Sequence, residues 1–258
     1  AAAGVAPEEL DIIILGTSSP DRNYPSDACS VQAAIGAVNA VAFDISAACA
    51  GFIFAMNIVE GFFKAGIYKT ALIIGAETLS KVTDWSDRGT CVLFGDGAGA
   101  AVLKAEETGI IDMMMGADGT KGDVLACTSR TVGNFLTGTK PELGFMTMDG
   151  QEVFKFAVRK VPESVLELLN RTGTKKEDIK YYVLHQANER IIEAAARRLK
   201  EPMEKFPMTI SQFGNTSTAS IPLLLDDMIQ KDMLKRGDKI IMSGFGAGMT
   251  WGAVLMEW

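Results

Sequence analysis

Short apolar runs alternate with longer stretches of helical periodicity along the chain. The runs with the length and branched side chains typical of strands lie at 11–15, 70–75, 181–184 and 239–242. The stretches with helical periodicity lie at 51–64, 152–170 and 221–230. This alternation predicts an α/β fold in which helices cover both faces of a parallel or mixed sheet.

One helical stretch, GFIFAMNIVEGFF at 51–63, is apolar on almost every side. A helix of that composition belongs in the interior, because it has no polar face to present to water. We therefore expect this helix to lie between two layers of the fold.

The two halves of the chain resemble each other. Leu15 and Leu184 end matching apolar runs and are 169 positions apart, and an alignment of the following turns pairs Cys49 with Thr216, 167 positions apart. A nearly constant offset over several segments predicts two pseudo-repeated βα halves that pack as twins.

The repeat predicts three segments. Residues 1–116 form a first half, 117–150 a loop-rich connection, and 151–258 a second half. The helix expected at 152–170 has no counterpart before the strand at 11–15, so we expect the first half to be truncated at its start. The connection is rich in Gly and Thr and is long enough for a lid or an interface element, although a plain surface excursion fits as well.

Composition narrows the class of protein. The 258 residues carry 25 Lys and Arg against 32 Asp and Glu, a net charge of −7, which argues against a nucleic-acid partner. No signal peptide and no membrane-spanning apolar run is recognised in the sequence, so we expect a soluble cytoplasmic protein. Its four cysteines form no C-x-x-C pair, and the single histidine excludes a multi-histidine metal centre. We expect no metal.

Cys49 is a candidate nucleophile. It lies in AACAGF, directly after the strand-like VAFDIS and directly before the buried helix. A helix N-terminus stabilises a thiolate, so this position predicts a lowered thiol pKa. The alternative is a small buried apolar residue, which is the more common fate of a free cysteine.

His185 and Asn215 are the candidate partners of this cysteine. His185 follows the strand YYVL, at the carboxyl end where sites of layered α/β folds gather. Asn215 lies in FGNTSTASIP, near the repeat counterpart of Cys49. A structural histidine and an ordinary turn asparagine are the alternatives. Together the three residue types suit acyl transfer through a thioester.

Two glycine-rich segments need separate interpretation. GDGAGA at 95–100 matches a dinucleotide fingerprint, but a strand-like run follows where that motif requires a helix, so we reject it. GFGAG at 244–248 ends an apolar run, and its backbone N–H groups could form an oxyanion hole or simply a tight turn.

A basic cluster follows His185 on an otherwise acidic protein. Its members are Arg190, Arg197, Arg198 and Lys200. Solvated surface charge is one interpretation, and a docking surface for an acidic partner is the other.

The segments AACAGF, HQANERI, GNTSTASIP and GFGAGMTWG together resemble β-ketoacyl-acyl carrier protein synthase III, the condensing-enzyme family of the thiolase superfamily that initiates fatty acid synthesis. The resemblance covers essentially the whole chain. It implies a layered αβαβα fold, a homodimer, and no cofactor beyond the substrates, which are a coenzyme A thioester and a malonyl group on phosphopantetheine.

The resemblance also implies roles for individual residues. Cys49 would carry the acyl group, and His185 and Asn215 would promote decarboxylation of malonyl-acyl carrier protein. The backbone N–H groups of Cys49 and Ala247 would form the oxyanion hole. The implied substrate-binding residues are Arg88, Asn188, Phe245 and Tyr24, the last of which would reach the partner subunit's acyl pocket. The implied docking residues for the acyl carrier protein are Arg190, Arg197 and Arg198.

The same residues separate this chain from other condensing enzymes. Elongating synthases use two histidines, and thiolases need a second cysteine near the C-terminus, whereas no cysteine follows Cys127. A related Cys-His-Asn condensing enzyme of polyketide or secondary metabolism, a cysteine hydrolase, and an inactive thiolase-fold fragment stay open as alternatives.

Overall fold

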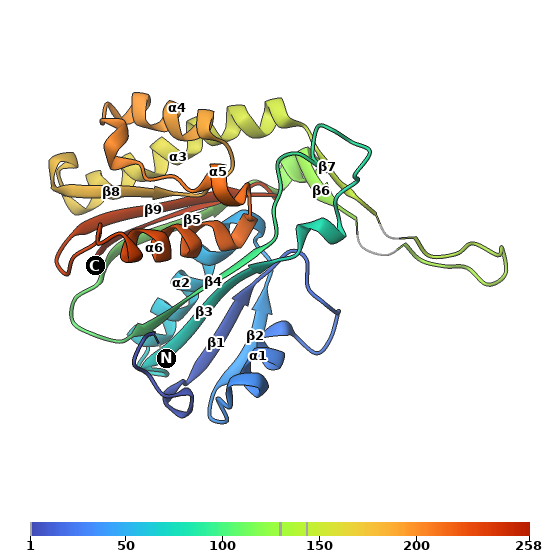
Figure 1. The fold of residues 1–258 in the computed structure, drawn as a ribbon, viewed down its shortest axis with the longest axis horizontal. Helices are drawn as coiled ribbons and strands as arrows, with labels where there is room; N and C mark the ends of the chain where they lie inside the picture. The colour runs from blue at the N-terminus through green and yellow to red at the C-terminus, as the bar shows by residue number, and fades with distance from the viewer. Residues whose placement is uncertain (1, 129–130, 143) are drawn as a thin grey trace.

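The computed structural model describes residues 2–128, 131–142 and 144–258, and its main elements stack in five layers (Figure 1). Two four-stranded mixed sheets are separated by one layer of helices and covered by helices on their outer faces. The layering is the αβαβα arrangement that the family resemblance implies, and it agrees with the α/β fold predicted from the alternation of apolar runs and helical stretches. None of the helices in the described ranges is long and apolar enough to cross a membrane.

The first sheet has the strand order β2, β1, β3, β4. Its strands are β1 (Ile12–Gly16), β2 (Val41–Ile45), β3 (Thr70–Glu77) and β4 (Gly97–Lys104). β1 is parallel to β2 and β3, and β4 is antiparallel to β3. All five residues of β1 are buried, because helices cover both faces of the sheet there.

The second sheet has the order β5, β10, β9, β8. Its strands are β5 (Ile110–Ala117), β8 (Ile179–Leu184), β9 (Lys239–Gly246) and β10 (Thr250–Glu257). β8 is parallel to β9, and the other two pairings are antiparallel. β5 belongs to the first half by sequence but pairs with β10, so the first half contributes a strand to the second sheet.

The helices divide among the three helical layers. α2 (Gly51–Lys64) and α6 (Ser220–Gln230) lie between the sheets, α1 (Asp27–Ile35) covers the first sheet, and α3 (Gly150–Thr172) and α4 (Glu189–Leu199) cover the second (Figure 1). The expectation that the apolar helix lies between two layers is confirmed. Its core cluster includes Ile73 of the first sheet and Val254 of the second.

The remaining elements are short. They are α5 (Ile210–Phe213), the strands β6 (Leu125–Cys127) and β7 (Met146–Met148), and the 3-10 helices η1 (Pro7–Glu9), η2 (Ala48–Ala50), η3 (Leu79–Lys81), η4 (Gly119–Val124), η5 (Lys176–Asp178), η6 (Met203–Lys205) and η7 (Ser217–Ala219). β6 and β7 pair within the connection, and residues 131–142 extend away from the layers (Figure 1). A lid or interface role of this segment stays a prediction.

Strand register supports the repeat. Leu15 pairs with Ile74 in the first sheet, and Leu184 pairs with Ser243 in the second. Both members of the second pair lie 169 positions after their counterparts. The two sheets therefore repeat the same parallel pairing at a constant offset.

The turns before α2 and α6 follow the same offset, which corrects the sequence alignment at this point. η7 begins 169 positions after η2, and α6 begins 169 positions after α2. The structural counterpart of Cys49 is thus Thr218, whereas the alignment paired Cys49 with Thr216. Asn215 corresponds to Ser46, three residues before the cysteine.

Gly75 of β3 provides a test of how closely the two halves pack. A Cβ at this position would lie 2.4 Å from the backbone oxygen of Thr218, whereas a Cβ at Gly61 in α2 would meet nothing within 4 Å. We expect Gly75→Ala to lower the free energy of unfolding by about 1–3 kcal/mol, because backbone must move to admit the methyl group. Gly61→Ala, the matched control, should raise the free energy of unfolding by about 0.5–1 kcal/mol. Chemical denaturation followed by circular dichroism measures both, and equal effects would contradict the packing described here.

Candidate active site

Cys49 lies where the sequence analysis places it, at the junction between a strand and the central helix. β2 ends at Ile45. The 3-10 helix η2 begins at Ala48, whose φ of 46° is left-handed, and leads directly into α2. Such a conformation is costly for a residue other than glycine and is found mainly where surrounding packing enforces it. Cys49 itself is buried.

The electrostatic surroundings of Cys49 differ from the expectation. Burial raises the pKa of the thiol to about 12, a contact with the Ser217 side chain lowers it, and the negative charge of Glu77 raises it further. The prediction of a lowered thiol pKa is therefore wrong, because desolvation outweighs the favourable field of the helix N-terminus. In this structure the side chain of Cys49 is therefore a neutral thiol.

His185 is also buried and neutral. Its backbone N–H donates to Ser243 O (2.8 Å), and its Nδ1 lies 2.6 Å from Ser220 Oγ. Desolvation lowers the pKa of the imidazole to about 3. Nε2 is buried without a hydrogen-bond partner among the described residues, which leaves this atom to serve a ligand.

Asn215 is held by the segment that the sequence analysis rejected as a dinucleotide site. Its N–H donates to Leu93 O and its carbonyl accepts from Gly95 N, both at 2.9 Å, and β4 follows as the expected strand. The side-chain Oδ1 accepts the N–H of Ser217 at 2.9 Å. The amide NH2 is then the end of this side chain that can donate to a substrate oxygen.

The end of β9 brings the candidates together. A Cβ at Gly246 would lie 2.6 Å from Cys49 N, so only glycine lets the strand approach the nucleophile turn this closely. The preceding residue, Phe245, packs its ring against the His185 imidazole with centroids 5.4 Å apart. Ala247 follows directly. The backbone here is compatible with an oxyanion hole formed by the N–H groups of Cys49 and Ala247, and that role stays a prediction.

Phe245 lies at this centre, and the other candidate substrate contacts are Arg88, Asn188 and Tyr24. Arg88 is exposed next to Gly89, which lines an open pocket of about 740 Å³ with residues 147–151. The Asn188 side chain caps α4 by accepting Arg190 N at 2.9 Å. Phe245 is buried against His185, and Tyr24 is 84% exposed in the loop after β1.

The basic cluster is partly neutralised by its neighbours. Arg190, Arg197 and Arg198 are all exposed on α4. Arg197 pairs with Glu193 at 3.5 Å, and Arg198 pairs with Glu163 at 3.8 Å. Within the parts of the chain that the structure describes, the ion pairs do not include Arg190, so its charge is the most available to a partner.

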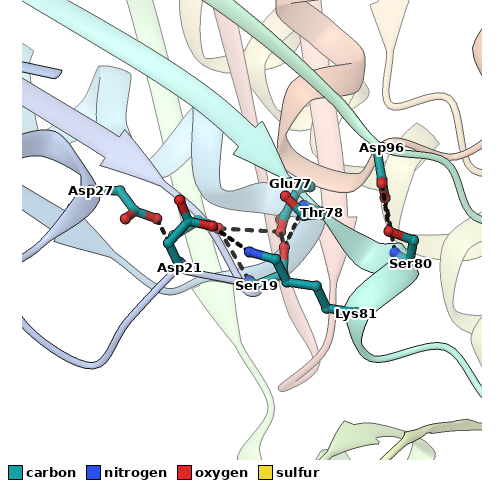
Figure 2. A network of polar contacts seen from close by, with 9 residues as sticks. Ser19, Asp21, Asp27, Glu77, Thr78, Ser80, Lys81 and Asp96 are labelled. Atoms are coloured by element: carbon teal, nitrogen blue, oxygen red, sulfur yellow. Dashed lines mark hydrogen bonds and ion pairs between the residues drawn. The ribbon is translucent and has the colours of Figure 1, made fainter. Parts of the chain in front are cut away.

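Sequence reasoning missed Glu77, the last residue of β3. This buried carboxylate accepts a hydrogen bond from Ser217 Oγ at 2.9 Å. It accepts another from Ser19 Oγ at 2.6 Å (Figure 2). The repeat could have identified it, because Glu77 lies 169 positions before Gly246, the glycine that packs against Cys49. Elsewhere in the described ranges, no group of three His, Cys, Asp or Glu side chains is placed to hold a metal ion.

The buried His185 predicts a specific pH dependence of stability. Its pKa is about 3 in the folded chain and 6.5 when free, so stability is lost as pH falls through 6.5 toward 3, where only the unfolded state takes up the proton. Between pH 7 and 4.5 the wild type should lose roughly 2 kcal/mol of unfolding free energy more than His185→Gln. Because His185 is the only histidine, the variant removes all imidazole titration. Denaturant titrations at both pH values measure the difference, and parallel losses would show that His185 is solvated.

Comparisons with known proteins identify the family of this chain. Residues 43–119 match the family described as 3-oxoacyl-[acyl-carrier-protein (ACP)] synthase III, and residues 169–258 match the C-terminal family of the same name. The chain is 51% identical to β-ketoacyl-[acyl-carrier-protein] synthase III of Clostridium acetobutylicum, over 99% of this chain and 79% of the relative, and 52% identical to that of Clostridium novyi, over 99% and 80%. The crystal structure of 3-oxoacyl-[acyl-carrier-protein] synthase III from Aquifex aeolicus superposes with a TM-score of 0.91 at 46% identity, over 99% of this chain and 80% of that one. This chain belongs to the β-ketoacyl-[acyl-carrier-protein] synthase III family of thiolase-like condensing enzymes.

Proposed function

We propose that this chain transfers an acyl group from a coenzyme A thioester to Cys49 and condenses it with malonyl-acyl carrier protein, with loss of carbon dioxide. The observation that carries the proposal is the pair of neutral donors beside a buried thiol. His185 offers an unpartnered Nε2, and Asn215 offers its amide NH2. Two neutral donors suit a transient oxyanion, because each can stabilise it with a hydrogen bond and keep its own proton.

In the first half-reaction, Cys49 attacks the thioester carbonyl. The Cys49 S–H bond breaks as the sulfur–carbon bond forms, and the proton ends on the departing coenzyme A thiol. The N–H groups of Cys49 and Ala247 stabilise the tetrahedral oxyanion. The close seat of Gly246 on Cys49 N supports this assignment, because a side chain there would close the space.

In the second half-reaction, His185 and Asn215 stabilise the enolate left by decarboxylation of the malonyl thioester. Ser220 Oγ accepts the Gln186 N–H at 3.3 Å and lies 2.6 Å from Nδ1. It can therefore give its own proton to Nδ1, which leaves the ring proton on Nε2, directed at the substrate. The enolate carbon then bonds to the acyl carbon as the bond between that carbon and the Cys49 sulfur breaks. The 3-oxoacyl carrier protein leaves, and the Cys49 sulfur takes up a proton from water.

The electrostatics argue against the hydrolase alternative. A cysteine hydrolase of the thiolate–imidazolium type needs a low thiol pKa and a protonated histidine. Here burial raises the pKa of Cys49 and lowers the pKa of His185, so the neutral form of each side chain is favoured. Neutral groups in a desolvated site suit transfer to carbon.

The proposal extends to the substrates and partners. Arg88 binds the coenzyme A nucleotide beside the pocket that Gly89 lines, and Asn188 contacts the pantetheine arm. Phe245 shapes the acyl site through its contact with His185. Thioester substrates carry the reactive groups, so the reaction as written needs no added metal or redox cofactor. The enzyme would work in the cytoplasm, where both substrates are dissolved.

We further propose a homodimer in which Tyr24 reaches the partner subunit's acyl pocket. The high exposure of Tyr24 supports this, since a large aromatic side chain in open solvent is typical of an interface. β2 is an edge strand of the first sheet among the described residues, and the side chain of Val41 on it is 48% exposed. Such an edge is available for a second copy.

The acyl-enzyme gives the most direct test. After incubation with acetyl-coenzyme A, intact-protein mass spectrometry should show one acetyl group per chain, and peptide mapping should place it on Cys49. Cys49→Ala should abolish the increment. Cys127→Ala, the matched control, removes an exposed thiol and should keep it. Acetylation that follows Cys127, or none on a folded chain, would contradict the proposed half-reaction.

Docking of the acidic carrier protein on α4 predicts a substrate-specific defect. Arg190→Glu should raise the KM for malonyl-acyl carrier protein about tenfold, because a rim charge that steers a charged partner is reversed. Arg236→Glu reverses an exposed charge just before β9, at the opposite end of the sheet from Gly246, and should leave this KM unchanged. Steady-state kinetics at low salt measure both, and equal responses would place the docking surface elsewhere.

A further inference from the structure

Ser217 has a strained backbone conformation at the start of η7. Its φ of 49° lies in the left-handed region, which glycine adopts freely and other residues occupy at a cost. The same strain occurs at Ala48, 169 positions earlier, where η2 begins. In a residue other than glycine, such a conformation persists only where surrounding contacts hold it. The contacts of Ser217 therefore decide whether this turn keeps its shape.

The backbone N–H of Ser217 orients the Asn215 side chain. It donates to Asn215 Oδ1 at 2.9 Å, two residues back along the chain, as in an Asx turn. Both side chains are buried. Oδ1 and Nδ2 belong to one planar amide and point apart, so a donor that holds Oδ1 also sets the direction of Nδ2. The direction of the Asn215 NH2 group thus depends on the turn at Ser217.

The main chain of Asn215 is fixed independently of this turn. Its N–H donates to Leu93 O and its carbonyl accepts the Gly95 N–H, both at 2.9 Å. These bonds hold the backbone against the segment before β4. They do not set the side-chain torsions, because neither involves the amide group. Among the hydrogen bonds of the described residues, the bond from Ser217 N is the one that holds this amide.

Glu77 holds the Ser217 side chain. Ser217 Oγ donates to Glu77 Oε1 at 2.9 Å, and Thr218 Oγ1 lies 3.0 Å from the same oxygen. Both contacts are buried, and both join η7 of the second half to β3 of the first. A buried hydrogen bond is stronger than the same bond in water, because its surroundings screen it less. The contact with Glu77 can therefore offset the strain at Ser217.

The other oxygen of Glu77 is fixed to the first half. Oε2 accepts from Ser18 N at 3.0 Å. It also accepts from Ser19 Oγ at 2.6 Å, and Ser19 Oγ in turn accepts the Thr78 N–H at 2.7 Å (Figure 2). The carboxylate is thus held between the loop after β1 and the end of β3. It gives the Ser217 turn a fixed point of attachment.

We propose that Glu77 is a positioning residue for Asn215: its hydrogen bond to Ser217 Oγ holds the left-handed turn, and that turn directs the Asn215 amide toward the substrate. This inference rests on the proposed function, in which Asn215 stabilises the enolate of the malonyl group. The hydrogen bonds of Glu77 in the described residues include none to Cys49, His185 or Asn215, so its effect passes through Ser217.

Replacing Ser217 by alanine or by glycine separates the turn from the hydroxyl. Both variants lose the bond to Glu77 and the effect of the hydroxyl on the pKa of Cys49, but only glycine adopts a positive φ without strain. Ser217→Ala should lower kcat for carbon dioxide release from malonyl-acyl carrier protein about tenfold, and Ser217→Gly should stay within about threefold of wild type. KM for this substrate should change less than about twofold, because other groups dock the carrier protein.

The first half-reaction provides the internal comparison. Loading of Cys49 by acetyl-coenzyme A, followed by intact-protein mass spectrometry, should proceed at the same rate in the two Ser217 variants, since both lack the hydroxyl. A difference confined to carbon dioxide release assigns the effect to the Asn215 step. Equal losses of kcat in the two variants would overturn the proposal.

Ser164→Ala is the matched control for the loss of a buried hydroxyl. Ser164 Oγ donates to Lys160 O at 2.8 Å within α3, which covers the second sheet. This variant should lose stability to a similar extent as Ser217→Ala and keep the wild-type kcat. A fall in kcat as large as that of Ser217→Ala would mean that lost stability causes both, and would overturn the positioning role.

Amide hydrogen exchange tests Glu77 itself and needs no substrate. The N–H of residue 217 is bonded to Asn215 Oδ1, so its protection factor, measured by NMR, reports on the turn. Glu77→Ala and Ser217→Ala should each lower this protection factor about tenfold, and Ser217→Gly should lower it less. The His185 N–H, which donates to Ser243 O, should keep its protection and controls for general loosening.

Unchanged protection at position 217 in a folded Glu77→Ala chain would overturn the proposal. If that variant does not fold, unchanged protection in Ser217→Ala would overturn it equally. The inference and the proposed function fail in different ways. A wild type that releases no carbon dioxide but shows the expected exchange pattern refutes only the proposed function. A wild type that decarboxylates the malonyl group, with equal kcat in the two Ser217 variants, refutes only the role of Glu77.

Discussion

The structure depends on a reciprocal close contact between its two halves. The backbone of Thr218 packs against Gly75 of the first half. The counterpart of Gly75 in the second half is Gly244, where a Cβ would lie 3.4 Å from Cys49 O. Each half thus supplies a strand that has a glycine where the turn of the other half packs against it. Because the contacts are made by backbone, neither turn can shift without displacing a sheet. Cys49 takes its position from this mutual packing.

The two equivalent places have diverged in what fills them. The bare backbone of Gly246 stands beside Cys49, and His185 directly follows the neighbouring strand β8. Their counterparts beside Thr218, each 169 positions earlier, are Gly16 and Glu77. One place therefore holds a neutral histidine and bare backbone. The other is filled by a carboxylate and its donors, and it serves as the support for the first.

Much of this could be predicted from the sequence, because strands, helices and catalytic motifs have local signatures. The helix at 51–64 was predicted with the bounds that the structure shows, since its apolar character ends where α2 ends. The placement of Cys49 and His185 after strands also needs only local pattern. The thiol pKa could not be predicted, because burial by the second half opposes the helix N-terminus and is invisible locally. Sequence reasoning missed Glu77 for the same reason, because its hydrogen-bond donors include Ser19 and Ser217, and Ser217 lies 140 residues farther along the chain.

The hydrogen bond from Thr218 Oγ1 to Ala48 O joins residues 170 positions apart. During synthesis, which runs from the N-terminus, Cys49 leaves the ribosome long before His185, Asn215 or Thr218 is made. Contacts of such long range form late, after the entropy of closing the loop has been met. The left-handed turn at Ala48 has no local reason to form alone. The geometry of this site is consequently one of the last features to assemble, and in a nascent or partly folded chain Cys49 lacks the burial that raises the pKa of its thiol.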